Sequence, residues 1–377
     1  MGGGSGRPRG GREMASTVRG SDGNGEVLFF IPDIGGFTRF VAETEIRHSQ
    51  HIVKELLEIL VDANALGLEV SEIEGDAVLF VREGPPPTLD ALVDQARRMF
   101  VAFHAHLQRI ERFRVCQCGA CVGASRISLK IVAHAGLSST MQIKGHRKFI
   151  GTDIIIAHRL LKNSVPVAEY LLVTQSTLAR LPAAADDPLR SFGDGSSAYA
   201  ELGDIAYRYK ALAGYLGEVV IEPPLRMGLK NPVQVMTLSQ PVAVPVEQVF
   251  QRLIDLPARM QWIDGIRSIE FRDDSANHIG KVHRCVRDGS DPELVTSDVK
   301  VAPQSMELWE TDVRRMASCR YLLTRMPGDV TRVTVEFFVR GNLLLRLAFK
   351  AFAERRFKAS FERSLRNLAA VCEGREV

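Results

Sequence analysis

Apolar residues recur along this chain at two spacings, and the spacing predicts where helices and strands lie. A continuous apolar run that ends at Asp33 predicts a buried strand, and steps of three and four residues after Phe37 predict a helix. The predicted order is strand, helix, strand pair, helix, strand pair, helix and strand, over residues 26–33, 37–61, 68–81, 89–110, 128–150, 154–163 and 170–173. This order predicts an α+β fold with helices packed on one mixed sheet.

The pattern changes after the Pro223-Pro224 pair, and we place a domain boundary near residues 215 to 228. One or two helices over 245–262 are followed by stretches of period two up to Arg340, which predict antiparallel strands. A helix from about residue 343 to Cys372 ends the chain. The predicted domains are 26–220 and 228–377, and the Gly-rich, polar residues 1–25 are predicted to form a disordered arm.

Composition limits the classes of partner. The 377 residues include 48 basic and 45 acidic side chains, a balance that argues against a nucleic-acid partner. No apolar run of about eighteen residues appears, so we expect no transmembrane segment and no signal peptide, and a cytoplasmic location. Three of the six cysteines crowd together and the others are scattered, which is unlike the framework of a secreted disulfide protein.

Two acidic residues stand at predicted chain turns. Asp33 ends the first strand before a Gly-Gly-Phe-Thr loop, and Asp76 lies at the tip of the first hairpin. If the two strands are neighbours, both carboxylates project from one edge of the sheet, where oxygen ligands suit Mg²⁺ or Mn²⁺ and a phosphate-bearing substrate. The adjacent glycines and the helix that begins near Phe37 would admit the phosphates. The alternative is that both residues only cap a helix and form a turn.

The motifs around these residues resemble those of the class III adenylate and guanylate cyclases, in the same order along the chain. The matching segments are Phe30 to Thr38, Glu72 to Ala77, Leu129 to Gly136 and Phe149 to Arg159. The resemblance implies a ferredoxin-like nucleotide cyclase sandwich that holds Mg²⁺ or Mn²⁺ at Asp33, Ile34 and Asp76. It also implies that the nucleoside triphosphate contacts Gly36, Phe37 and Thr38.

The same resemblance assigns the remaining site residues. Glu72 stands at the purine-reading position, where a carboxylate can accept the N1 and N2 hydrogens of guanine, and Lys148 stands at the second such position. Arg159 falls on the arginine that neutralises charge in the transition state. Ile155 departs from the family's asparagine and Lys148 from its Asp, Cys or Ser, and a Glu72–Lys148 ion pair would fill the base pocket. Solvated positions for Glu72 and Arg159 are the structural alternative.

Two functions follow from this resemblance. The first is a nucleotide cyclase, a phosphorus-oxygen lyase that forms a 3′,5′-cyclic nucleotide from a purine nucleoside triphosphate. The second is a catalytically degenerate sensor or carrier that binds a nucleotide or lipid without turnover. Since the family's active sites form between two cyclase domains and this chain carries one, a homodimer is expected.

Cys116, Cys118 and Cys121 place three soft ligands within six residues, which suits Zn²⁺ or an iron–sulfur centre. A closed zinc site needs a fourth ligand, and the histidines of the preceding helix, His104 and His106, or a second protomer are candidates. Reduced thiols in a surface loop are the alternative. A Cys-x-Cys-x-x-Cys insert beside a cyclase-like region is similar to that of an uncharacterised bacterial group.

From about residue 231 the order of strand, helices, antiparallel run and terminal helix resembles the START-like, helix-grip (SRPBCC) superfamily, which includes polyketide cyclase-like and lipid-transfer proteins. The resemblance implies a hydrophobic small molecule or lipid between sheet and helix. The candidate lining residues are Trp262, Trp309, Phe337, Phe338 and Phe352. The alternative is that these aromatic side chains only form the core.

Overall fold

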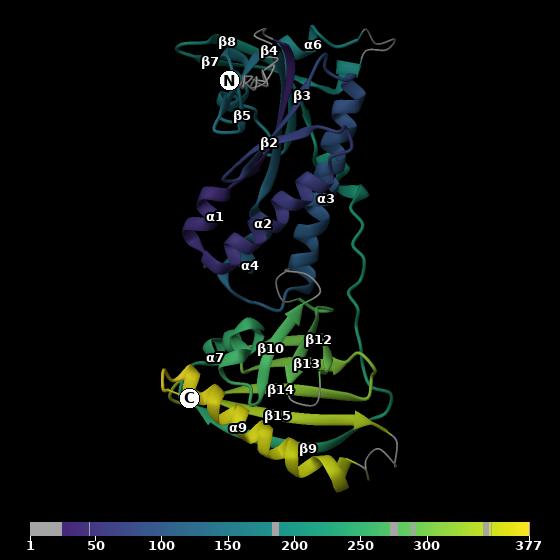
Figure 1. The fold of residues 1–377 in the computed structure, drawn as a ribbon, viewed down its shortest axis with the longest axis vertical. Helices are drawn as coiled ribbons and strands as arrows, with labels where there is room; N and C mark the ends of the chain where they lie inside the picture. The colour runs from purple at the N-terminus through teal and green to yellow at the C-terminus, as the bar shows by residue number, and fades with distance from the viewer. Residues whose placement is uncertain are drawn as a thin grey trace, which may run out of the picture.

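The computed structural model describes residues 25–44, 46–182, 188–271, 278–287, 291–341, 347 and 349–376. They form two sheets, one from each half of the chain, and residues 219–231 run between them without helix or strand (Figure 1). The predicted arm lies outside the described residues except for Gly25, which begins the first strand. None of the helices in these ranges is both long and apolar enough to span a bilayer.

The N-terminal half alternates strands and helices as the periodicity predicts up to residue 174, but the predicted helix over 37–61 is two helices, and the strands over 193–211 were not predicted. Its elements are β1 (Gly25–Gly35), α1 (Phe37–Glu43), α2 (Ile46–Asp62), β2 (Glu69–Glu74), β3 (Ala77–Glu83), α3 (Leu89–Phe113), α4 (Gly119–Gly123), β4 (Ser128–Ile143), β5 (His146–Ile150), α5 (Thr152–Arg159), β6 (Tyr170–Thr174), α6 (Gln175–Leu178), β7 (Gly193–Tyr199) and β8 (Gly203–Ala211). The strand order is β2-β3-β1-β4-β6-β8-β7, with β5 paired to β4. Because β1 pairs antiparallel to both β3 and β4, the first four strands have the βαββαβ ferredoxin-like arrangement that was predicted.

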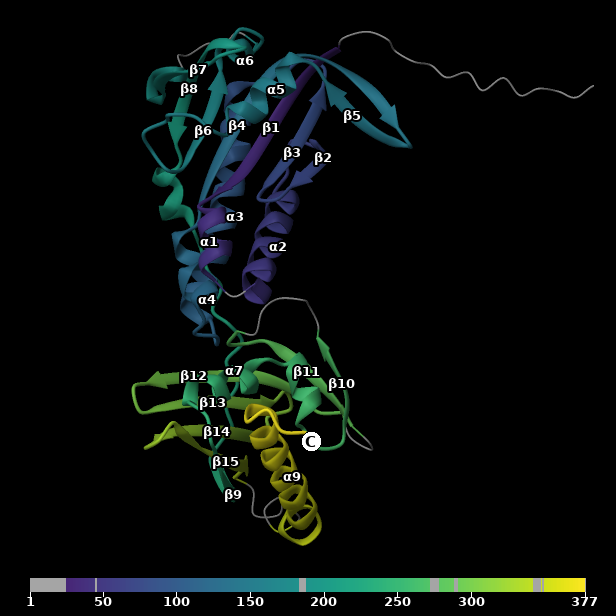
Figure 2. The ribbon, with the colours of Figure 1, turned by 90° about the vertical axis from the view of Figure 1, so that its left-hand side faces the viewer.

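Strand β1 is apolar throughout because both of its faces are covered. Leu28 and Phe30 belong to a buried cluster that includes α2 and α3 residues. Phe29 and Ile31 point the other way and pack with residues of β3 and α5. The predicted helices therefore cover two faces of the sheet, with α5 opposite α2 and α3 (Figure 2).

A buried histidine fixes α5 against β4. His134 is 1% exposed, and its ring nitrogens lie 2.9 Å from Thr174 Oγ1 and 2.9 Å from Asp153 Oδ1. The other carboxylate oxygen of Asp153 accepts the Leu137 N–H at 2.8 Å. A Cβ at Gly136 would lie 2.0 Å from the Asp153 carboxyl carbon, so this approach requires glycine.

The C-terminal half is a seven-stranded antiparallel sheet that curls around a terminal helix, as predicted (Figure 1). Its elements are β9 (Pro232–Val242), α7 (Val246–Ile254), β10 (Ile266–Phe271), β11 (Val282–Arg287), β12 (Glu293–Ala302), β13 (Ser305–Asp312), β14 (Ala317–Met326), β15 (Val330–Arg340) and α9 (Glu354–Cys372). The order is β10-β11-β12-β13-β14-β15-β9. A π-helical turn over Phe349–Ala353 precedes α9, and residues 342–346, where the terminal helix is predicted to begin, lie outside the described residues.

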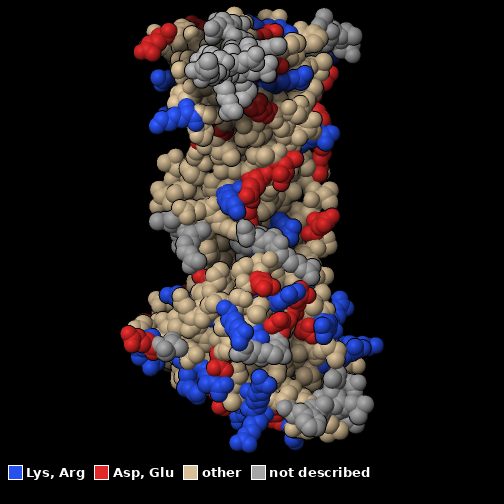
Figure 3. All heavy atoms as spheres, viewed as in Figure 1, with Lys and Arg blue, Asp and Glu red and all other residues tan. Residues whose placement is uncertain are grey.

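Charged side chains of both signs intermingle on the face of Figure 1 (Figure 3). They are dense over the C-terminal half and sparser over the N-terminal half. This face therefore carries no field of a single sign.

Candidate functional site

Asp33 and Asp76 lie at the same edge of the sheet, as predicted. Asp33 is opposite Ala77 in the β1–β3 register, and the Ile34 N–H donates to the Asp76 carbonyl at 3.0 Å. Asp33 is 6% exposed. Burial raises the pKa of Asp76, and the negative charge of Asp33 raises it further. Two carboxylates thus share a poorly solvated edge. A divalent cation bound there would reduce the repulsion between their negative charges.

A lysine that sequence reasoning missed completes this edge. Lys130 is opposite Asp33 in the β1–β4 register, and its Nζ lies 2.7 Å from Asp33 Oδ2 and 2.8 Å from the Leu161 carbonyl oxygen. A lysine inside the apolar run of β4 was the available signal, because a partly buried ammonium needs a partner. Any cation bound here shares Asp33 with Lys130.

The predicted phosphate-contacting residues follow Asp33 directly. Gly36 has a φ of 83°, a left-handed conformation that glycine adopts without strain, and it precedes α1. Phe37 lines a shallow groove with Val53 and Leu57 of α2 and Ile73, while Thr38 is exposed. The loop therefore presents backbone and a hydroxyl beside the carboxylates.

The three predicted base-reading and charge-neutralising residues line a second, open groove. Glu72, Lys148 and Arg159 meet there, and Lys148 Nζ lies 3.8 Å from Glu72 Oε1, so the ion pair considered from the sequence is present. Partial desolvation raises the pKa of Glu72. Ile155 projects into the same groove and is 51% exposed. The groove thus has a cationic arginine but an aliphatic side chain where the resemblance implies a donor.

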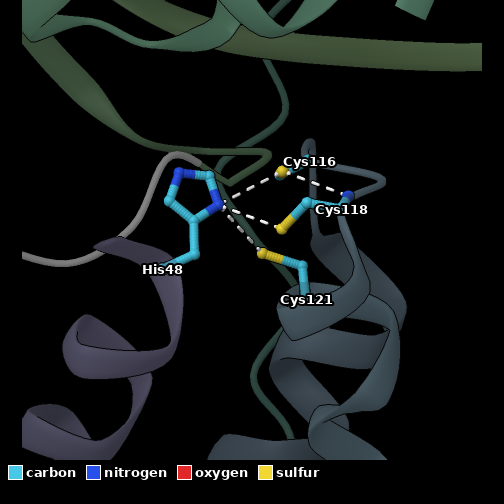
Figure 4. Close-up of side chains that lie close together, drawn as sticks. All are labelled: His48, Cys116, Cys118 and Cys121. Atoms are coloured by element: carbon cyan, nitrogen blue, oxygen red, sulfur yellow. Dashed lines mark hydrogen bonds between the residues drawn. The ribbon is translucent and has the colours of Figure 1, made fainter. Parts of the chain in front are cut away.

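The cysteine insert forms a compact cluster with a histidine from α2 (Figure 4). His48 Nδ1 lies 3.1 Å from Cys118 Sγ, 3.3 Å from Cys116 Sγ and 3.6 Å from Cys121 Sγ. All four ligand atoms lie within 4.8 Å of one another, and the three cysteines are free and buried. This group could hold a metal ion.

The fourth member of this cluster was not the one expected. His104 Nε2 lies 2.8 Å from Glu169 Oε1 and His106 Nε2 lies 2.9 Å from Glu55 Oε2, so both expected ligands are engaged elsewhere. His48 precedes Cys116 by 68 positions, and no local pattern connects them. Only the packing of α2 beside α4 brings His48 to the sulfur atoms.

The thiols of the cluster cannot all ionise independently. Hydrogen bonds from Cys118 and Cys121 lower the pKa of Cys116, whereas hydrogen bonding to Cys116 and Cys118 raises the pKa of Cys121. The Cys116 thiolate is therefore stabilised by the hydrogen bonds that it accepts. A bound cation would allow several thiolates to coexist.

The C-terminal sheet encloses a cavity of about 580 Å³. Of the predicted lining residues, Phe337 lines it together with Phe357 and Phe361 of α9. Trp262 is fully buried and does not line this cavity. The Phe352 side chain lies outside the described residues.

Trp309 and Phe338 were expected to line the cavity but do not. Successive strand residues face opposite sides of a sheet, and these two face away from the cavity. Their rings lie 5.4 Å apart, and the Arg320 guanidinium lies 5.6 Å from the Trp309 ring. Arg320 and Glu336 are opposite each other in the β14–β15 register, on the face away from Phe337. Both aromatic side chains therefore belong to the outer face of the sheet.

One wall of the cavity is polar, which sequence reasoning missed. Arg259 is 1% exposed; its Nη1 lies 2.7 Å from Glu310 Oε1 and its Nε donates to the Leu253 carbonyl at 2.9 Å. The buried His283 lies 3.5 Å from Glu310 Oε1, too far for a hydrogen bond, and burial lowers its pKa to about 4. Arg259 Nη2 and both His283 nitrogens have no hydrogen-bond partner among the described residues.

Two family models match parts of the chain. Residues 53–170 match "Protein of unknown function (DUF2652)", and residues 234–373 match "Polyketide cyclase / dehydrase and lipid transport". The uncharacterized protein Rv2561/Rv2562 of Mycobacterium tuberculosis is 30% identical over 155 residues, which make up 39% of this chain and 72% of that protein.

Solved structures that are similar to the chain include nucleotide cyclases. The guanylyl cyclase Cya2 is 14% identical with a TM-score of 0.38, over 51% of this chain and 94% of that chain. A bacterial light-regulated adenylyl cyclase is 18% identical with a TM-score of 0.37, over 51% of this chain and 52% of that chain.

Proposed function

We propose a nucleotide-binding function for this chain, which belongs to the family of the uncharacterized protein Rv2561/Rv2562 of Mycobacterium tuberculosis. The N-terminal half binds a purine nucleoside triphosphate with Mg²⁺ or Mn²⁺ at Asp33 and Asp76. The observation that carries this proposal is the pair of carboxylates at one edge, where Asp33 opposes Ala77 and the Asp76 carbonyl accepts the Ile34 N–H.

The residues at this edge fit a divalent cation. Asp33 and Asp76 provide carboxylate oxygens, and the raised pKa of Asp76 reflects burial and the nearby charge of Asp33. A bound cation supplies positive charge to the phosphates. Asp33, which pairs with Lys130, would share its charge with that cation, and Gly36 and Thr38 would lie beside the phosphates.

The second groove supports a homodimer. It is lined by Glu72, Lys148 and Arg159 but by neither aspartate. Large apolar side chains are exposed around it and on the hairpin that extends from it: Val70, Ile73, Met141, Ile143, Ile150 and Ile155. A second copy that covers this surface would bring its own carboxylates to the groove and complete the nucleotide site.

Turnover to a 3′,5′-cyclic nucleotide is slow at best in this proposal. Ile155 offers no hydrogen bond to a developing charge, and the loss of one such donor costs roughly 10²- to 10³-fold in rate. The Lys148–Glu72 pair must also open before Glu72 can accept hydrogen bonds from a purine. The chain therefore acts as a nucleotide sensor in the cytoplasm, where nucleotides and reduced thiols are both found.

Calorimetry with GTP and ATP in the presence of Mn²⁺ tests the proposal. We expect binding to the full chain and its loss in the Asp33→Asn/Asp76→Asn variant, while Asp194→Asn on the exposed strand β7 is the control. Mass spectrometry of the same samples measures cyclic product. Equal binding by the double variant and the wild type would remove the carboxylate edge from the proposal.

We also propose that the C-terminal half binds an amphipathic small molecule or lipid. The observation that favours this second function is the cavity whose walls combine Phe337, Phe357 and Phe361 with the polar Arg259. The Arg259–Glu310 pair is neutral overall, so the spare Nη2 donor suits a carbonyl or carboxyl oxygen at one end of an apolar ligand.

Binding of a long-chain fatty acid, measured by displacement of a fluorescent analogue, tests this second function. Ala317→Phe, which adds a ring to the cavity lining, is expected to abolish binding. Trp309→Phe on the outer face of the sheet is the matched control and should bind normally. Loss of binding in both variants, or in neither, would count against the cavity as the site.

A further inference from the structure

We infer that His48, Cys116, Cys118 and Cys121 form a closed zinc site that fastens helix α2 to the loop after α3, beside the C-terminal half (Figure 4). This site lies apart from the carboxylate edge and uses none of the residues of the proposed nucleotide site. It is therefore a second, independent metal centre.

The spacing of the ligand atoms fits a single tetrahedral ion. Bond lengths of about 2.3 Å to sulfur and about 2.0–2.1 Å to nitrogen place the ligands of tetrahedral zinc roughly 3.5–3.8 Å apart. His48 Nδ1 lies 3.1, 3.3 and 3.6 Å from the three sulfur atoms. These distances are within a few tenths of an ångström of the nitrogen–sulfur separation in tetrahedral zinc. The sulfur atoms, which lie within 4.8 Å of one another, would approach each other by up to about 1 Å to accept zinc at their centre.

The donor set selects zinc over the alternatives. Three thiolates and an imidazole are soft and borderline ligands, which Mg²⁺ and Mn²⁺ do not prefer. An iron–sulfur cluster distributes its thiolates over several iron atoms, whereas these four atoms converge on one point within 4.8 Å. Since four protein ligands complete a tetrahedron and leave no open position, the site is structural.

The positions of the ligands indicate what the ion holds together. His48 lies in the first turn of α2, and Cys118 is the N-cap residue of α4. Cys116 Sγ lies 3.3 Å from Gln251 Oε1 on α7 of the C-terminal half. Phe113, the last residue of α3, lies three positions before Cys116, and its carbonyl accepts the Ile279 N–H at 2.9 Å. The ion thus joins two segments of the N-terminal half at the place where it meets the C-terminal half.

Zinc content of the full-length, tag-free chain is the first measurement. We expect about one zinc ion per chain, and at least a tenfold lower content in His48→Ala and Cys118→Ser. His106→Gln and Cys372→Ser are the matched controls, because His106 pairs with Glu55 and Cys372 lies on α9, and both should retain zinc.

Cobalt substitution of the wild-type chain reports the coordination of the metal without relying on variants that could fold poorly. The wild-type chain refilled with Co²⁺ should show thiolate charge-transfer bands and the intense d–d bands of a four-coordinate ion. His48→Cys, which replaces one soft ligand by another, should retain a four-coordinate spectrum with stronger thiolate bands. A six-coordinate cobalt spectrum, zinc that persists in His48→Ala and Cys118→Ser, or stoichiometric iron with acid-labile sulfide would each overturn the zinc site.

Discussion

Asp33 and Asp76 share an edge of the sheet, but Asp33 lies beside a positive charge and Asp76 is affected by a negative one. Asp33 is paired with the Lys130 ammonium at 2.7 Å, whereas the pKa of Asp76 is raised by burial and by Asp33. A carboxylate with a raised folded-state pKa binds protons more tightly in the folded chain than in the unfolded chain. Its ionisation therefore lowers stability above that pKa, and stability returns as the pH falls through it.

The two asparagine variants should consequently change the stability of the metal-free chain in opposite directions. Asp33→Asn leaves the Lys130 ammonium without its counter-ion and is expected to cost about 1–3 kcal/mol. Asp76→Asn removes the repulsion and should raise the midpoint of thermal unfolding at neutral pH, with the gain vanishing in acid. Thermal unfolding in chelator across pH measures both effects. A destabilised Asp76→Asn chain at neutral pH would contradict the charge assignment.

Ile155 places an aliphatic side chain where the cyclase resemblance implies a hydrogen-bond donor. If the missing donor limits turnover, Ile155→Asn should raise the rate of cyclic nucleotide formation by about tenfold or more. Ile155→Val, which restores no donor, should leave the rate unchanged, and adding Asp76→Asn to Ile155→Asn should abolish the gain. Product is counted by mass spectrometry at saturating Mn²⁺ and nucleotide. An unchanged rate in Ile155→Asn would mean that the Lys148–Glu72 pair or dimer geometry is limiting.

Residues with sequence motifs around them could be predicted, and residues defined only by packing could not. The motif order places Glu72, Lys148 and Arg159, and the structure brings them into one groove. His48 and Arg259 carry no local signal, because each meets its partners through contacts between distant segments. Folding alone creates those two sites.

At the scale of elements, periodicity predicts the order and type of helices and strands well. It predicts less well where each element ends and which face of the sheet it covers. The hairpin turn at Gly75-Asp76 lies where the sequence predicts it. α5 ends at Arg159, before the predicted limit, and covers the face of the sheet opposite α3. Since β1 is buried on both faces, its continuous apolar run could not indicate which helix packs on which side.

The hairpin of β4 and β5 is the element that should decide oligomeric state. β4 pairs with β1 only as far as Ser138, and beyond it pairs with β5 alone, so the hairpin projects from the sheet (Figure 2). Ile143 near its tip is exposed. Arg147 on β5 pairs with Glu69 and Glu83, but the apolar side chains near the tip stay exposed, which is typical of a surface that another chain covers.

Ile143→Asp should therefore shift the homodimer to monomer without unfolding it. A buried, unpaired carboxylate at an interface costs several kcal/mol, whereas the same residue on a free surface costs almost nothing. Light scattering coupled to gel filtration measures the mass, and circular dichroism verifies the fold. Val301→Asp, at another exposed strand position, is the control. A wild-type chain that is monomeric at all concentrations would refute the dimer.

At the scale of the whole molecule, the two sheets are joined by more than the connecting segment 219–231. One buried apolar cluster extends from the N-terminal sheet through Val115 and Cys116 to residues such as Phe250 in the C-terminal half. The Cys116–Gln251 contact and the Ile279–Phe113 hydrogen bond lie at this junction. The two halves should therefore unfold together as long as the junction is intact.

Zinc and Gln251 should determine whether the two halves unfold together in one transition. Removal of the ion frees His48 and the thiols. In the zinc-loaded chain Cys116 is a thiolate with no proton to donate to Gln251 Oε1, so the Gln251 amide would turn its Nε2–H toward the sulfur atom. Gln251→Ala removes that hydrogen bond, worth about 1 kcal/mol, and leaves the four ligands in place. By calorimetry we expect one transition for the zinc-loaded chain and two for the zinc-free chain. Gln251→Ala should retain zinc yet broaden or split the transition, whereas Gln248→Ala on the exposed side of α7 should not. A single transition in the zinc-free chain would mean that the apolar contacts of the junction couple the two halves without the ion.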